Sequence, residues 1–136
     1  MSDKIINTLL WIIMSGMLGY FFYIQGWIFA DFENLSTSEA KYIIENDKNI
    51  TLVDVRSRLE YKRDYIKGAI NIPASELKES LVKIKPFQNR KIVVYSERGD
   101  RSLDMARLLS KKGFRVLHFK GGMVFWIRRG YVVSRP

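Results

Sequence analysis

The chain has 136 residues, a length that allows one compact domain with a short additional segment but no second domain of ordinary size. Its 23 Lys and Arg residues outnumber its 14 Asp and Glu residues, which gives a formal net charge of +9 at pH 7. The chain contains no cysteine, and this excludes disulfides, zinc sites with thiolate ligands and persulfide chemistry on its own side chains.

The first segment of the chain has the character of a membrane span. No charged residue occurs between Lys4 and Asp31, and aromatic residues crowd the second half of this stretch. As a helix, residues 5–30 would be about 39 Å long, against about 30 Å for the hydrocarbon core of a bilayer. We therefore expect an N-terminal tail at residues 1–4, a transmembrane helix at 5–30, a linker at 31–35 and a soluble domain at 36–136.

Two other interpretations of residues 5–30 are weaker. A buried core helix of a small domain is normally amphipathic, whereas this stretch is apolar on every face. A cleaved signal peptide has a shorter apolar region, and the exit from this stretch has no small-x-small cleavage site. We therefore expect a single-pass membrane protein. Lys4 on one side and Lys41 and Lys48 on the other leave open the side of the membrane on which the domain lies.

The excess of positive charge lies in the segment after the apolar stretch, because only Asp3 and Lys4 precede that stretch. A basic domain beside a bilayer favours anionic lipid headgroups or a small anion as ligands. The basic residues are scattered along the chain and no nucleic-acid-binding motif is present, so we expect no nucleic-acid partner.

The soluble part alternates predicted helices and strands. They are a helix at 37–47 after a Ser36 cap, a strand at 50–55, a helical turn to about residue 62, a strand at 69–73, a helix at 75–84, a strand at 91–95, a helix at 101–112, a strand at 114–119 and a helix at 123–129. This alternation predicts an α/β fold with a mostly parallel sheet flanked by helices. Ligands of such sheets bind beyond the carboxyl ends of the strands, which directs attention to the loop after the strand at 91–95.

That loop consists of Ser96, Glu97, Arg98, Gly99, Asp100, Arg101 and Ser102. A compact turn at the start of a helix can direct several backbone N–H groups at one anion, and the helix dipole adds to the attraction. The guanidinium of Arg98 or Arg101 could bind the same anion. The alternative is an ordinary strand-to-helix turn, in which Ser102 or Asp100 only caps the helix.

Several motifs, in this order, resemble a rhodanese domain over roughly residues 36–133. They are Asp54-Val55-Arg56 after a strand, Glu60-Tyr61, the run from Ile66 to Pro73, the strand and loop from Val93 to Ser102, Gly113-Phe114, and Gly121-Gly122-Met123 with Trp126. The resemblance implies a parallel sheet flanked by helices and puts Ser96 at the position of the reactive cysteine. It also implies that Asp54, Arg56 and Trp126 hold the fold rather than act in catalysis. The length of the loop is similar to that of the sulfurtransferases, not to the longer loop of related phosphatases.

Ser96 changes the chemistry that the resemblance implies. Rhodaneses carry a sulfane sulfur from a donor such as thiosulfate on a cysteine persulfide, which a serine oxygen cannot form. A serine nucleophile also needs an adjacent general base. The only histidine, His118, lies on the following strand, where we expect a packed or surface side chain. Tyr65 stands where many members of the family have histidine.

We therefore predict a membrane-anchored domain without sulfurtransferase activity of its own, acting as a binding or regulatory module. Its expected partners are the lipid bilayer, a small anion such as thiosulfate or sulfate at the loop, and a protein that the sequence does not identify. We expect no cofactor and no metal. Two alternatives stay open: a sulfurtransferase whose activity was lost or whose cysteine was engineered to serine, and a hydrolase or transferase that uses Ser96 directly.

Overall fold

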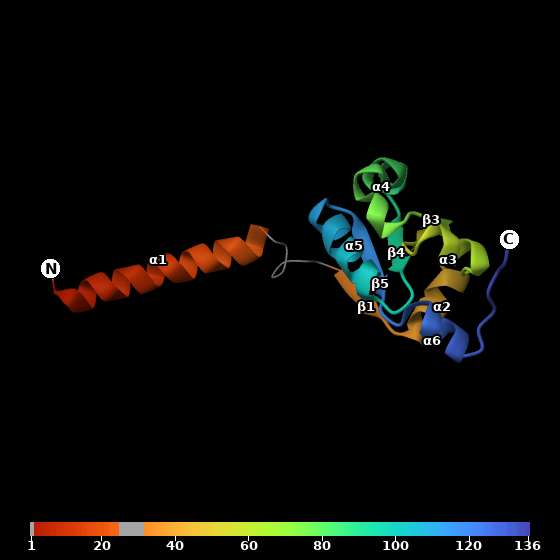
Figure 1. Ribbon diagram of the computed structural model, residues 1–136, viewed down its shortest axis with the longest axis horizontal. Helices are drawn as coiled ribbons and strands as arrows, with labels where there is room; N and C mark the ends of the chain where they lie inside the picture. Colours follow the sequence, from red (N-terminus) through yellow and green to blue (C-terminus); the bar gives the residue numbers. More distant parts are fainter. Residues whose placement is uncertain (1, 25–31) are drawn as a thin grey trace. The chain divides into compact units, whose positions relative to one another are not determined.

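The structure is a computed structural model that describes residues 2–24 and 32–136 (Figure 1). It divides into two compact units, Met1–Ala30 and Asp31–Pro136. The first unit contains helix α1 (Asp3–Ile24), a helix of 22 residues with no buried side chain. At about 33 Å, α1 is long and apolar enough to cross a membrane. The helix starts at Asp3, inside the predicted tail, and the predicted span at 25–30 lies outside the described residues.

The second unit is built on a parallel sheet of five strands in the order β1-β5-β4-β2-β3. The strands are β1 (Phe32–Leu35), β2 (Ile50–Asp54), β3 (Ile70–Asn71), β4 (Lys91–Tyr95) and β5 (Arg115–Phe119). The helices are α2 (Thr37–Asn46), α3 (Arg58–Arg63), α4 (Leu77–Ile84), α5 (Asp100–Lys111) and α6 (Gly122–Arg128), with short 3-10 helices η1 (Ala74–Glu76) and η2 (Lys85–Phe87). The predicted α/β class with a parallel sheet flanked by helices is confirmed.

Strand β1 shows that the prediction of a linker at residues 31–35 was wrong for residues 32–35. These residues pair in parallel with residues 116–119 of β5, and the side chain of Leu35 is buried. The sequence pattern does not predict this strand, because the exposed Glu33 and Asn34 interrupt its apolar residues. An edge strand has a neighbour on one side only, and short, polar edge strands are common because they discourage pairing with other chains. The folded domain therefore begins before residue 36.

Hydrophobic side chains form a core on each face of the sheet. One core joins the sheet to α2 and α6 and includes Val93, Phe119, Met123 and Trp126. The other joins it to α4 and α5 and includes Ile92, Val94, Ile84, Met105 and Leu109. Figure 1 shows α4 and α5 on one side of the sheet and α2 and α6 on the other. Strand β4 is covered on both faces, which explains its continuous apolar sequence and fixes the start of the loop that follows it.

Two helices begin with the same capping arrangement. Ser36 caps α2 and Ser57 caps α3, and in each case the hydroxyl accepts from the N–H of a glutamate three residues later. The side chain of that glutamate, Glu39 or Glu60, accepts in return from the backbone N–H of the serine. Such a cap contributes about 1 kcal/mol to a helix. The cap of α3 also fixes Glu60, which faces the candidate site.

Removal of residues 1–30 should leave a soluble, folded monomer, because every element of the second unit begins after Ala30. Removal of residues 1–35 should lower the free energy of unfolding by about 2–4 kcal/mol, since it also takes away β1 and the buried Leu35. Urea unfolding followed by circular dichroism compares the two fragments. Equal stabilities would mean that β1 is not part of the fold, and an unfolded first fragment would place the apolar segment in the core.

Candidate functional site

The 96–102 loop connects the carboxyl end of β4 to the start of α5 and is held tightly by its surroundings. The N–H groups of Met123 and Val124, in the first turn of α6, donate to the carbonyl oxygens of Ser96 and Glu97 at 2.9 and 3.0 Å. Gly99 has a φ of 99°, and a Cβ atom there would lie 2.3 Å from the carbonyl oxygen of Lys120. A side chain at position 99 would therefore be strained and would push β5 away from the loop.

The hydroxyl of Ser96 lies inside the turn, not at its surface. Ser96 is 1% exposed. Its Oγ accepts from the backbone N–H of Gly99 at 3.1 Å and from that of Ser102 at 3.2 Å, and it donates to the Oγ of Ser102 at 3.1 Å. The N–H of Ser102 is one of the unpaired donors of the first turn of α5, so Ser96 caps this helix from before its start. In the alternative interpretation of the loop as an ordinary turn, Asp100 or Ser102 would supply this cap, whereas the structure has Ser96 in that role.

Other backbone donors of the loop remain available. Within residues 32–136, no acceptor is in hydrogen-bonding position for the backbone N–H groups of Arg98, Asp100 and Arg101. These donors lie at the N-terminus of the 12-residue helix α5, where the helix dipole favours negative charge. The loop can therefore offer these N–H groups to an anion, even though those of Gly99 and Ser102 already donate to the Ser96 oxygen.

Glu97 turns away from the loop and into a buried cluster around Arg56. Arg56 is 0% exposed, and its guanidinium donates to the carboxylates of Asp54 at 2.8 Å, Asp64 at 3.3 Å and Glu97 at 3.1 Å. It also donates to the carbonyl oxygen of Asp64 at 2.6 Å. Burial opposes the charged form of Arg56, but the hydrogen bonds to Asp54 and Glu97 outweigh it and raise the pKa of Arg56 above its usual range.

Arg101, one of the two candidate anion ligands, forms an ion pair with Glu60. Its guanidinium donates to both carboxylate oxygens of Glu60, at 2.7 and 2.8 Å, so its fork is not directed at an anion in the loop. The Arg101 guanidinium holds the pKa of Glu60 at about 2. Sequence analysis missed this pair because the two residues are far apart in the chain. Arg98, the other candidate, is exposed and has no carboxylate within ion-pair distance in residues 32–136.

His118 connects the loop to the edge strand β1. Its Nε2 lies 2.9 Å from the Oγ of Ser102, and its Nδ1 lies 2.8 Å from the Oδ1 of Asn34. Nε2 also lies 3.2 Å from the carbonyl oxygen of Gly99, to which the hydroxyl of Ser102 donates at 3.0 Å. Burial lowers the pKa of His118 and favours the neutral ring. Of the two predicted environments for His118, packed or at the surface, the structure shows the packed one. Its contacts form part of a polar series of side chains from Asn34 through Ser102 to Ser96.

The remaining predicted residues lie at the margin of the site. Asp100 is exposed at the first turn of α5. Tyr65 lies outside the loop, where its ring stacks on that of Tyr61 and its backbone pairs with Ser134. In residues 2–24 and 32–136, no group of three His, Asp or Glu side chains is arranged to hold a metal ion.

A family comparison agrees with this arrangement of strand, loop and helix. Residues 36–129 match the family model described as rhodanese-like domain. The chain belongs to the rhodanese-like domain family. The solved structure of a rhodanese-related protein from Thermoplasma volcanium superposes on this rhodanese-like domain with a TM-score of 0.67 and 31% identity, covering 76% of this chain and 98% of that one.

Two curated relatives have sequences similar to the rhodanese-like domain. Thiosulfate sulfurtransferase PspE of Escherichia coli is 34% identical over 71 residues, which cover 52% of this chain and 68% of that protein. The tRNA uridine(34) hydroxylase of Buchnera aphidicola is 34% identical over 99 residues, which cover 69% of this chain and 31% of the hydroxylase. The chain therefore spans about a third of the length of the hydroxylase.

Replacing Arg101 with alanine should lower the free energy of unfolding by about 1 kcal/mol at pH 7. The effect is small because Arg101 is partly exposed and solvent screens its ion pair with Glu60. The folded pKa of Glu60, about 2, lies below its unfolded value, so the stabilisation is complete above pH 5 and is lost as the pH falls towards 2. Urea unfolding at several pH values measures this. The matched control is Arg98→Ala in the same loop, which should change nothing. If the Arg101→Ala variant lost the same free energy of unfolding at pH 2 as at pH 7, the ion pair with Glu60 would not be the cause of the loss.

Proposed function

We propose that this rhodanese-like domain is carried by a single membrane span and acts as a binding module without sulfurtransferase activity. Its 96–102 loop binds a small anion such as sulfate or thiosulfate, or an anionic group of a protein partner. The observation that carries the proposal is the hydroxyl of Ser96 at the base of the loop, in a chain that contains no cysteine.

The chemistry at residue 96 supports the absence of sulfur transfer. A persulfide forms when an enzyme thiolate attacks a sulfane sulfur and makes a sulfur–sulfur bond, so it needs a thiol at the reacting position. We assign Ser96 to that position because it directly follows β4 and its oxygen accepts the two N–H groups that would stabilise a thiolate there. A serine hydroxyl stays protonated at neutral pH unless a base removes its proton.

Charges around the loop support noncovalent anion binding. The carboxylate of Glu60 is paired with Arg101, and that of Glu97 is paired with Arg56 and, at 3.7 Å, with Arg63. These ion pairs weaken the repulsion that the two carboxylates exert on an anion. Within residues 32–136, no carboxylate lies within ion-pair distance of the guanidinium of Arg98. Together with the unpaired N–H groups at the start of α5, these features favour an anion at the opening of the loop.

Helix α1 supports the membrane location. None of its side chains is buried against the rest of the described chain, and its length and composition suit a bilayer. The side of the membrane on which the domain lies stays open.

The proposal predicts that the full chain gives only background rates in a thiosulfate–cyanide sulfurtransferase assay. Its Ser96→Cys variant should exceed that background at least tenfold, because the N–H groups of Gly99 and Ser102 and the start of α5 lower the pKa of a thiol at this position. Thiocyanate formation by the purified protein in detergent is the measurement. The matched control is Ser38→Cys, which adds an exposed thiol outside the loop and should stay at background.

Two results would count against the proposal. Turnover by the unmodified chain would show that it transfers sulfur without a cysteine, and the proposed lack of activity would be wrong. A Ser96→Cys variant that folds but stays at background would mean that residue 96 is not the position at which the family carries sulfur.

A serine enzyme is the second candidate function, and one observation favours it. The Ser96 hydroxyl donates to Ser102, whose oxygen lies 2.9 Å from Nε2 of His118, so polar side chains connect Ser96 to a histidine. The proton of Ser102 itself is directed at the carbonyl oxygen of Gly99 and would have to turn towards His118. The burial of Ser96 and the two N–H donors on its oxygen disfavour attack by that oxygen. Labelling of Ser96 by a fluorophosphonate, with loss of labelling in His118→Phe, would establish this candidate.

A further inference from the structure

The edge of the sheet opposite the 96–102 loop is formed by the amino ends of the parallel strands. Strand β1 begins there at Phe32, so the chain enters the domain at this edge directly after the segment that follows α1. Lys91 and Arg115 are the first residues of β4 and β5 and are register partners on neighbouring strands. The turns that precede β4 and β5, and the C-terminal end of α5, lie at the same edge.

Basic side chains gather at this edge. The exposed ones are Lys48, Arg90, Lys91, Lys111, Lys112 and Arg115. Lys91 is paired with Asp47 at 3.2 Å, and Glu33 also lies at this edge. Among residues 32–136, no carboxylate lies within ion-pair distance of Lys48, Arg90, Lys112 or Arg115. We call the surface formed by these six basic residues the entry edge, and it has a clear excess of positive charge.

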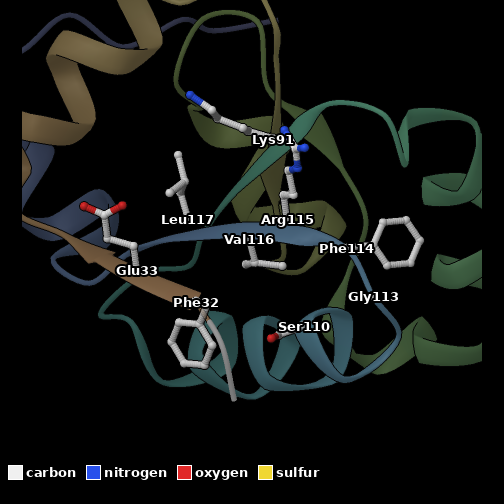
Figure 2. A pocket seen from close by; sticks show the side chains of 9 residues that line it. All are labelled: Phe32, Glu33, Lys91, Ser110, Gly113, Phe114, Arg115, Val116 and Leu117. Carbon is white, nitrogen blue, oxygen red and sulfur yellow. The ribbon is translucent and has the colours of Figure 1, made fainter. Parts of the chain in front are cut away.

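The entry edge also contains a hollow of about 420 Å³ that is lined by both apolar and polar side chains. Figure 2 shows Lys91 and Arg115 on one side of β5, and the side chains of Phe32, Val116 and Ser110 on the other. Phe114 forms a further part of its wall. Aromatic and aliphatic side chains beside basic groups suit the boundary of a bilayer, where a lipid phosphate adjoins glycerol and acyl chains.

Only residues 25–31 separate the end of α1 from the start of β1 in the sequence. Ile24 and Phe32 are eight residues apart in the chain, so they can lie at most about 29 Å from each other. If α1 spans a bilayer, the first residue of β1 stays within this distance of the membrane end of the helix. Basic groups tethered so near to an anionic surface are attracted to it, and each raises the binding constant about fivefold.

We propose that the entry edge binds the anionic phospholipid headgroups of the bilayer that contains α1. This inference rests on the proposed membrane span and is independent of the proposed role of the 96–102 loop. Contact at the entry edge directs the carboxyl ends of the strands away from the bilayer, because the two ends of a parallel strand lie at opposite edges of the sheet. The loop is then open to ligands from the aqueous side.

The test uses the full chain in nanodiscs, either of phosphatidylcholine alone or with about a third of phosphatidylglycerol. Because the chain has no cysteine, Asn89→Cys supplies one exposed labelling site in the turn before β4. A fluorophore there is quenched by nitroxide lipids labelled in the headgroup when the entry edge touches the membrane. We expect at least threefold stronger quenching in the anionic discs. A label at Leu59→Cys, which is 80% exposed and follows the carboxyl end of β2, should be quenched little in either.

Matched charge variants make the test specific. Lys112→Gln with Arg115→Gln should lower the docking constant about 25-fold. Lys62→Gln with Lys120→Gln is an equal loss of exposed charge beyond the carboxyl ends of β2 and β5, and it should leave the constant unchanged. Equal quenching in both kinds of disc, or equal effects of both double variants, would overturn the inference while leaving the span intact. A chain that does not incorporate into nanodiscs would overturn the proposed span and this inference with it.

Discussion

The buried guanidinium of Arg56 determines how the segments around the candidate site fit together. It binds Asp54 at the end of β2, Asp64 after α3 and Glu97 in the loop after β4, so one side chain fixes three segments that are separated in sequence. Removing one partner from such a buried charge cluster typically costs about 3–5 kcal/mol, because the remaining charges are left without compensation. The same cluster turns Glu97 inward and keeps its negative charge from the opening of the loop.

A second polar chain connects the start of the domain to the loop. Asn34 on β1 contacts His118 on β5, His118 contacts Ser102, and Ser102 accepts from Ser96. Strand β1 therefore contributes to the support of the proposed binding site. This series of hydrogen-bonded side chains joins β1 and β5 to the 96–102 loop.

Local sequence patterns predicted most of the fold and the position of the loop, and contacts distant in sequence were missed. The apolar run of β4, the Ser36 cap and the family motifs around Arg56 each depend on neighbouring residues, and each was found correctly. Strand β1 was missed because its stability comes from pairing with β5 rather than from its own composition. The partner of Arg101 and the link from His118 to Ser102 were missed because one sequence does not show which distant side chains meet.

The central claim is that the Ser96 oxygen accepts from the N–H groups of Gly99 and Ser102. Only those of Arg98, Asp100 and Arg101 are then left for an anion. Titration of the isotope-labelled full chain with sulfate, followed by NMR, tests this claim directly. In the unmodified chain the amides of Arg98, Asp100 and Arg101 should shift, and in Ser96→Ala those of Gly99 and Ser102 should shift as well, with sulfate bound about tenfold more tightly. The same affinity and the same shifted amides in both proteins would contradict the account.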